Sequence, residues 1–169
     1  MKKSTKIVTL SMAVLFIAAT CLWLLNNGGI NREGGGAIIT FTDGGEVISE
    51  VDFDYLGGLE SDTFEAVIRS SGNKPEDALY TGVLLTELLN DQGIDIEGKS
   101  SVIVKGLDGY MTKLTLPELE KKEVYLTYKM NGKPLKPRDD GGYGPFQLVI
   151  PGDPFSQRWC KYVCEVEIK

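Results

Sequence analysis

The stretch VYLTYKMNGKPLKPRDDGGYGPFQLVI, residues 124–150, decides how the rest of the sequence is interpreted. Its first seven residues alternate in the manner of a β-strand, and Asn131-Gly132 predicts a turn after them. The proline-containing segment that follows is expected to be extended. A Gly-rich loop, 139–144, then leads into a second apolar strand over 146–150. This loop is either part of a plain surface hairpin or a segment whose backbone approaches a ligand closely.

Short strands separated by turn signals dominate the rest of the chain, and helices are few. Asp43-Gly44-Gly45 predicts a hairpin, whereas Asp52–Ser61 has the composition of a turn-rich link. Thr81–Asn90 predicts a helix with one apolar face and Thr81 as its cap, and a short helix is expected to start at Thr115. Because no βαβ alternation is visible, the pattern predicts an α+β fold built on a mixed β-sheet. Strands are expected at residues 37–42, 46–51, 63–69, 100–105, 110–114 and 158–168.

Composition excludes several classes of function. The chain has 169 residues, a formal charge of -6 and no histidine. The absence of histidine rules out Ser-His-Asp and Cys-His catalysis, as well as any histidine-ligated metal. The acidic balance argues against a nucleic-acid partner. A domain of this size can bury a core without disulfides or structural metals.

The N-terminus has the pattern of a membrane anchor. Lys2, Lys3 and Lys6 precede an uncharged run over residues 7–25. At about 1.5 Å per residue, a helix of that length just spans the hydrocarbon core of a bilayer. Basic residues before the span predict a cytoplasmic N-terminus and an extracytoplasmic domain. A cleaved signal peptide, or lipidation at Cys21, is the alternative.

The sequence therefore predicts three parts. Residues 1–25 are expected to form a signal anchor or transmembrane segment, and residues 26–36 a flexible Gly/Asn-rich linker. The folded domain is expected to occupy residues 37–169. The predicted localisation is the cell membrane, with a single pass and the domain on the extracytoplasmic side.

Five segments carry motifs that occur together in one known family. They are TGVLLTELL (81–89), DGY (108–110), LTYKMNGKPL (126–135), GPFQLVIPG (144–152) and RWCKYV (158–163). Taken in this order, they resemble the oxidoreductase molybdopterin-binding domain, the fold of the sulfite oxidases. The resemblance covers roughly residues 67–168 and implies a pterin pocket between strand ends and loops.

The resemblance also implies which residues contact the cofactor. Lys161 matches the lysine of the segment that contacts the cofactor in the family. In the family a molybdenum-ligating cysteine precedes a Gly-Asn pair, and here Ser70 stands at that position in Arg69-Ser70-Ser71-Gly72-Asn73. A glutamine occupies a position where the family has a cofactor-contacting arginine. The predicted cofactor-binding residues are Ser70, Asn73, Gln147, Trp159, Cys160 and Lys161.

The two departures from the family weaken a site for an anionic metal cofactor. A thiolate is a soft ligand that is readily anionic at neutral pH, whereas the hydroxyl of Ser70 is harder and far less acidic. Gln147 keeps hydrogen bonding but loses the fixed charge and the fork of arginine. We therefore expect no catalytic residue, no metal ligand and no bound cofactor, although molybdopterin remains possible through the family resemblance.

Cys160 and Cys164 are expected on the strand 158–168. Residues four apart on one strand lie about 13 Å apart, too far for a disulfide. They are therefore predicted to be free thiols packed as small apolar groups, with a redox or metal role as the alternative.

Two sets of side chains could form part of a ligand site or, equally, an ordinary surface or core. The first is a cationic rim, which would bind an anion if the neighbouring Asp139 and Asp140 did not offset it. The second is an aromatic wall for a flat ligand. The rim would comprise Lys133, Lys136, Arg138, Arg158 and Lys161, and the wall Tyr110, Tyr143, Phe155 and Trp159.

Three functions fit these observations. The first is a binding module that uses the pterin pocket for a small anionic ligand or a protein partner. The second is a molybdopterin-dependent oxidoreductase, and the third is a subunit of a membrane redox complex. The loss of the cysteine favours the first, and the family resemblance favours the other two.

Overall fold

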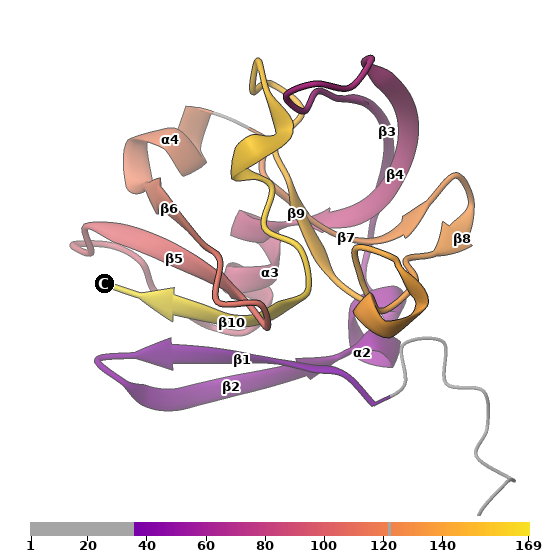
Figure 1. The fold of residues 1–169 in the computed structure, drawn as a ribbon. Helices are drawn as coiled ribbons and strands as arrows, with labels where there is room; N and C mark the ends of the chain where they lie inside the picture. The colour runs from indigo at the N-terminus through magenta and orange to yellow at the C-terminus, as the bar shows by residue number, and fades with distance from the viewer. Residues whose placement is uncertain (1–35, 122) are drawn as a thin grey trace, which may run out of the picture. The chain divides into compact units, whose positions relative to one another are not determined.

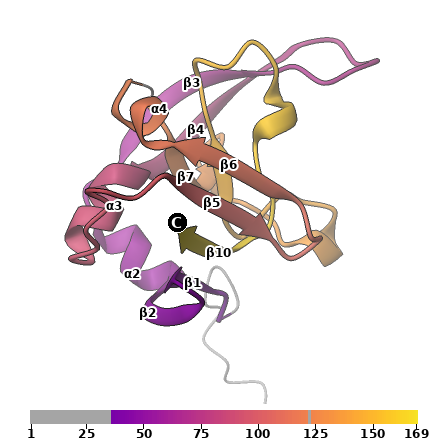
Figure 2. The ribbon, with the colours of Figure 1, turned by 90° about the vertical axis from the view of Figure 1, so that its left-hand side faces the viewer.

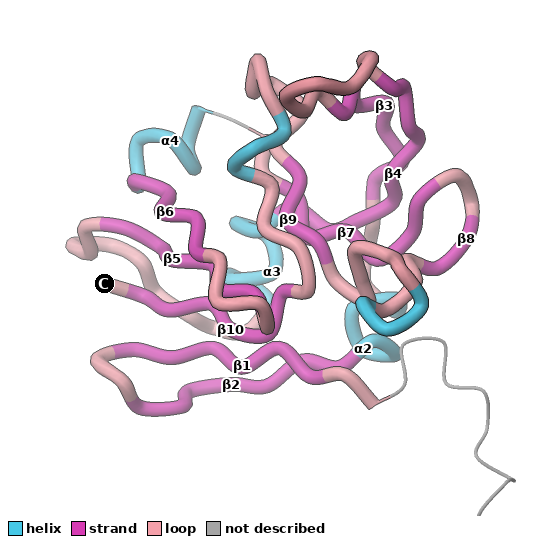
Figure 3. The backbone as a smooth tube through the Cα atoms, viewed as in Figure 1, coloured by secondary structure: helices cyan, strands magenta, loops and turns pink. Residues whose placement is uncertain are grey.

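The computed structural model describes residues 36–121 and 123–169 (Figure 1). The chain divides into two units, Met1–Arg32 and Glu33–Lys169, and all described residues belong to the second. They form two β-sheets joined by loops and a few short helices (Figure 3). The predicted anchor and almost all of the predicted linker lie outside the described residues. Within the described part, no helix is long and apolar enough to span a bilayer.

The first sheet joins the two ends of the domain. Its strand order is β2-β1-β10-β5-β6, and the only parallel pair among these strands is β1 with β10. The Asp43-Gly44-Gly45 hairpin connects β1 to β2, as predicted from the sequence. The strands are β1 (Ile38–Asp43), β2 (Glu46–Asp52), β5 (Ser101–Gly106), β6 (Met111–Thr115) and β10 (Val163–Ile168).

The second sheet is entirely antiparallel and is organised around β7. Strands β3, β4 and β7 lie in that order, and the other edge of β7 pairs with both β8 and β9. The stretch 124–150 thus forms the predicted hairpin, because β7 and β9 pair directly across the Gly-rich loop. The strands are β3 (Asp62–Ile68), β4 (Glu76–Leu84), β7 (Tyr125–Met130), β8 (Lys133–Pro134) and β9 (Gln147–Val149).

Short helices cover the ends of the strands. Figure 2 shows α2 and α3 next to each other on one side of the domain, where the Tyr55 hydroxyl donates to Asp91 Oδ2 at 2.7 Å. The short helix expected near Thr115 is α4. The helices are α2 (Phe53–Gly58), α3 (Leu85–Asp91) and α4 (Leu116–Lys121), with 3₁₀ turns η1 (Arg138–Asp140) and η2 (Ser156–Arg158).

Three element predictions were wrong in whole or in part, one of them the strand 158–168, which is a strand only from Val163 onward. The segment 81–84 is strand and not helix, because β4 hydrogen-bonds to β3 and β7 on its two sides. Helix α3 consequently starts at Leu85, whose N–H donates to the Val124 carbonyl at 2.8 Å instead of to a capping side chain. The supposed link after Asp52 contains α2, which that aspartate caps by accepting from the Tyr55 N–H at 2.8 Å.

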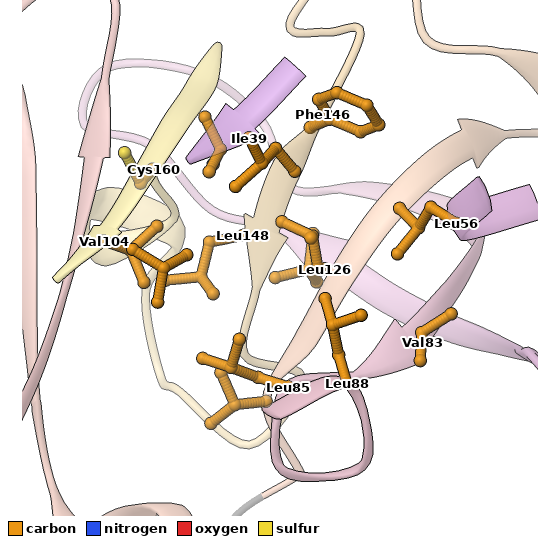
Figure 4. Close-up of a cluster of buried hydrophobic side chains, with 14 of the residues drawn as sticks. Ile39, Leu56, Val83, Leu85, Leu88, Val104, Leu126, Phe146, Leu148 and Cys160 are labelled. Carbon is orange, nitrogen blue, oxygen red and sulfur yellow. The ribbon is translucent and has the colours of Figure 1, made fainter. Parts of the chain in front are cut away.

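A single apolar core lies between the sheets and under α2 and α3 (Figure 4). Ile39 from β1, Leu126 from β7 and Leu148 from β9 are fully buried in it. The helices add Leu56, Leu85 and Leu88. Burial of each such side chain contributes roughly 1.5–3 kcal/mol, so this core is a major source of the stability of the domain.

The closest backbone approach in the second sheet is at Gly82. A Cβ at this position would lie 2.6 Å from the Leu126 carbonyl oxygen and 2.7 Å from the Thr127 Cα. The register between β4 and β7 shifts at the same point, between Thr81 and Gly82. Only glycine therefore allows these two strands to pair without displacing backbone.

We expect Gly82→Ala to reduce the free energy of unfolding by about 1–3 kcal/mol, because the new methyl group overlaps backbone that cannot move aside. Urea denaturation followed by circular dichroism measures the change. Gly58→Ala is the matched control, since a Cβ there meets no heavy atom within 4 Å. It should change stability by less than about 0.5 kcal/mol. Equal stability of the two variants would contradict the close-approach argument.

Candidate functional site

A cavity of about 300 Å³ lies where the ends of β3, β4 and β9 meet the segment around η2. This volume is at the lower end of the range for small-molecule sites, roughly 300–1,000 Å³. Its lining mixes aromatic rings with uncharged polar groups and includes one lysine and one aspartate. The lining residues are Ile68, Ser70, Tyr80, Asp108, Tyr110, Tyr143, Gln147, Ser156, Gln157, Trp159 and Lys161.

The loop after β3 is held against the η2 segment at the edge of the cavity. Ser156 donates twice to the Arg69 carbonyl, from its N–H at 3.1 Å and from its hydroxyl at 2.8 Å. Ser70 follows directly and lines the cavity. The Asn73 side-chain amide donates to the Ser70 hydroxyl oxygen at 3.1 Å and so fixes the turn from behind. The loop therefore presents a hydroxyl to the cavity.

Aromatic rings form much of the cavity wall. Trp159 meets Tyr80 edge-on, with ring centroids 6.0 Å apart, and its indole N–H donates to the Ile150 carbonyl at 3.2 Å. The Tyr110 hydroxyl donates to the Gln157 carbonyl at 2.6 Å, which ties the β5–β6 turn to η2. A wall of this kind offers flat surfaces for a planar ligand. Three of the four aromatic residues considered from the sequence lie here, whereas Phe155 is exposed and does not line the cavity.

Lys161 supplies the positive charge of the cavity. Its Nζ lies 3.9 Å from the centroid of the Tyr143 ring, and it makes no ion pair with any described residue. The backbone around it is tightly fixed, since Tyr162 has a φ of 55° and its N–H donates to the Tyr143 carbonyl at 3.0 Å. The ammonium group is thus held at the cavity by its ring contact and remains available to an anion.

The predicted cationic rim does not exist as one site. Arg158 is bound by carboxylates, with Nη2 2.6 Å from Glu118 and Nε 2.8 Å from Asp153. These contacts, foremost the hydrogen bond to Glu118, raise the pKa of Arg158. Lys133 and Lys136 line a different cavity of about 520 Å³ beside β8. Of the five proposed cations, Lys161 alone lines the cavity near Ser70.

Two polar atoms of the cavity residues lack partners. Tyr80 Oη and Gln147 Oε1 are buried and accept or donate no hydrogen bond within the described residues. Burial is the main reason that the pKa of Tyr80 is raised, so its phenol stays protonated. A buried polar group without a partner costs roughly 1–3 kcal/mol. The base of the cavity therefore carries hydrogen-bonding capacity that the protein itself does not satisfy.

The family model for the oxidoreductase molybdopterin binding domain matches residues 50–169. The chain belongs to this family. Among solved structures 19 chains match, including the sulfane dehydrogenase SoxCD from Paracoccus pantotrophus, with a TM-score of 0.64 and 20% identity. The alignment covers 81% of this chain and 39% of that chain, so this molybdopterin-binding-type domain spans well under half of its structural relative. No curated protein matches the sequence.

These comparisons confirm the predicted α+β, sulfite oxidase-like fold with its mixed sheet and few short helices. Four of the six residues assigned by resemblance, Ser70, Gln147, Trp159 and Lys161, line one cavity. Asn73 and Cys160 do not line the cavity, although the Asn73 side chain hydrogen-bonds to Ser70, which does. That any of these residues binds a cofactor stays a prediction. Reasoning from sequence missed Tyr80, Asp108, Ser156 and Gln157, although the Asp-Gly-Tyr motif had marked the β5–β6 turn.

The cavity fits the organic part of a molybdopterin better than its metal. The unpartnered Tyr80 and Gln147 atoms, the aromatic wall and the cation of Lys161 are complementary to a flat heterocycle with an anionic group. No thiol lines the cavity, and the Ser70 hydroxyl stands at the position that the resemblance assigns to the ligating cysteine. A hard, weakly acidic hydroxyl is a poor substitute for a soft thiolate. In the described part, no three His, Cys, Asp or Glu residues cluster as a metal site.

Cys160 and Cys164, the cysteines within the described residues, are free as predicted, but the strand argument that led to this prediction was wrong. Strand β10 begins at Val163, so a single extended strand does not connect Cys160 to Cys164. Cys160 lies before the strand, fully buried, with Sγ 3.7 Å from the Tyr110 carbonyl. Cys164 sits at the register shift between β10 and β5, with Sγ 3.5 Å from the Lys105 carbonyl. Lys161, which lines the cavity, lies in the irregular segment 159–162 before β10.

Burial raises the pKa of Cys160 to about 12, with smaller contributions from Asp108 and Cys164. A thiol reacts as its thiolate, so Cys160 should resist alkylation in the native protein at pH 8. We expect both Cys160 and Cys164 to be alkylated once the protein is unfolded in denaturant without reductant. Peptide mass spectrometry reads each cysteine separately. Protection of both in denaturant would show a disulfide and contradict the structure.

Proposed function

We propose that this chain is a binding module, in which the cavity holds a flat heterocycle with an anionic group and carries out no molybdenum-dependent oxidation. The observation that supports the proposal most directly is the composition of the cavity. It combines an aromatic wall, the Lys161 ammonium and unpartnered polar atoms with the absence of a lining thiol. A binding role needs the first three features, whereas a thiolate-ligated metal centre needs the missing one.

Each cavity residue has a distinct role in this proposal. Lys161 neutralises the anionic group of the ligand, and Tyr143 keeps the ammonium in place. Trp159 and Tyr110 flank the ring system. When a molybdopterin is bound in other members of the family, the metal supplies the redox chemistry. Here Ser70 offers only a hydrogen bond at that position.

A second candidate is an oxidoreductase, or a cofactor-bearing subunit of a membrane redox complex. The family match over residues 50–169 supports it, as does the similarity to a sulfane dehydrogenase, a named redox enzyme. In that case the module depends on additional protein, because the aligned relative is much longer than this domain. Co-purification from membranes separates this candidate from the first.

Molybdenum analysis of the purified full-length protein tests the proposal. We expect far less than one molybdenum per chain, even from cells that make the cofactor, because no thiolate is available at the cavity. Ser70→Cys combined with Gln147→Arg should raise molybdenum or pterin retention several-fold by restoring a soft ligand and a fixed charge. Ser71→Cys with Gln147→Arg is the matched control and should not. Near-stoichiometric molybdenum in the unmodified protein would support the oxidoreductase instead.

We further propose that residues 1–25 remain attached as a membrane anchor, with the domain on the extracytoplasmic side. Support comes from the basic residues before the apolar run and from the absence of an Ala-x-Ala cleavage motif after it. Intact-mass measurement of protein extracted from membranes should give the mass of the uncleaved chain. A mature N-terminus at or beyond Cys21 would refute the anchor.

A further inference from the structure

The cavity beside β8, the β8 cavity, is larger than the candidate site and has no role in the proposed function. It measures about 520 Å³, within the range of roughly 300–1,000 Å³ for small-molecule sites. Its walls come from the end of β7, from β8 and from the Gly-rich loop. Tyr143 is the residue that lines both this cavity and the candidate site. The two spaces are therefore neighbours with one shared wall.

Backbone contacts fix the walls of the β8 cavity. The Gly144 N–H donates to the Lys136 carbonyl at 2.8 Å, and the Gly142 N–H donates to the Pro137 carbonyl at 3.1 Å. A Cβ at Gly142 would overlap the Lys136 carbonyl, and a Cβ at Gly144 would overlap Leu135. The Gly-rich loop thus packs directly on the segment that follows β8. A cavity whose walls are fixed in this way costs little ordering when a ligand binds.

Positive charge collects at the β8 cavity, although the chain as a whole carries a formal charge of -6. Lys133 and Lys136 line it, and neither makes an ion pair with any residue in the described ranges 36–121 and 123–169. Asp139 and Asp140, which the sequence suggested as neutralising neighbours, lie in η1 and are not among the lining residues. The cavity therefore presents two ammonium groups and no carboxylate.

The other walls are mainly aliphatic. Met130, Pro134 and Leu135 line the cavity together with the single ring of Tyr143. Leu135 is buried and forms the floor, whereas the two lysines are exposed and lie at the rim. A ligand can consequently bury apolar surface against the floor while its charge stays at the rim, close to water, where desolvation costs little.

We propose that the β8 cavity is a second binding site, which takes an organic anion with a compact aliphatic body. Met130 and Leu135 cover the body, and Lys133 and Lys136 pair with the anionic group. Aliphatic walls favour such a body over the flat ring system that suits the aromatic wall of the candidate site. The inference goes beyond the proposed function and does not rest on it, because the two concern different cavities.

Calorimetric titration of the purified full-length protein with 4-cyclohexylbutanoate tests the proposal. Its primary amide has the same aliphatic body without the charge, and butanoate has the charge without the ring. We expect the acid to bind saturably and at least about fivefold more tightly than the amide, because only the acid pairs with the lysines. Butanoate should bind at least about tenfold more weakly than the acid, since it buries far less apolar surface.

Paired substitutions locate the anion. Lys133→Gln combined with Lys136→Gln should weaken binding of the acid at least about fivefold and leave the amide nearly unchanged. Lys129→Gln combined with Arg138→Gln is the matched control, because it removes two charges from the same segment but outside the lining. It should weaken the acid by less than about twofold, as should Lys161→Gln in the candidate site.

Each other outcome overturns the inference. Absence of saturable binding, or equal affinities for the acid and its amide, would show that the cavity does not select an organic anion. An equal loss in the two double variants would show attraction to general positive charge and no site. If Lys161→Gln alone weakens the acid, the anion occupies the candidate site, so that the inference fails while the proposed function stands. Stoichiometric molybdenum would defeat the proposed function and leave this inference intact.

Discussion

Backbone pairing on both edges of β7 is the constraint on which the rest of this domain depends. One edge pairs with β4 and the other with β8 and β9, so β7 spaces Tyr80 from Gln147. The β9 segment then connects to the chain beyond it, because the Leu148 N–H donates to the Cys160 carbonyl at 2.8 Å and the Val163 N–H to the Phe146 carbonyl at 2.9 Å. The cavity is thus built on backbone hydrogen bonds, which side-chain substitutions leave in place. Gly82 is required because this pairing leaves no room for a side chain.

Much of this architecture could be predicted from the sequence, most clearly at strands in which buried and exposed residues alternate. Strands β1, β3, β5 and β7 were predicted within a residue or two. In β1, β3 and β5 the buried residues lie mainly on one face. Residues 125–128 of β7 are buried on both faces, and the Asn131-Gly132 turn signal marked the end of this strand. Thr81–Leu84 failed for the opposite reason. Its apolar residues fit a helical period, and only the two neighbouring strands, distant in sequence, decide that it is extended.

The cavity could be predicted in part, because some of its lining residues lie in recognisable motifs. Ser70, Gln147 and Lys161 were identifiable from motifs with a fixed order, and the structure does bring them to one cavity. Tyr80 had no such signal, because a tyrosine on a strand is indistinguishable from an ordinary core residue until its hydroxyl is seen without a partner. The start of β10 at Val163 could not be predicted from the sequence either. The positive φ of Tyr162 depends on contacts with Tyr143 and Leu107, and residue type gives no indication of it.

The parallel pairing of β1 with β10 has a consequence for how the chain acquires its structure. Thr42 and Glu165 share a hydrogen bond across this pair although they are 123 positions apart. The first sheet therefore cannot close until β10 has been synthesised, whereas the strands of the second sheet all lie within residues 62–149 and can pair earlier. Contacts this distant in sequence slow folding. Until β10 pairs with β1, apolar side chains such as Phe41, which is fully buried in the folded domain, are exposed, and such surface makes a partly folded chain prone to aggregation.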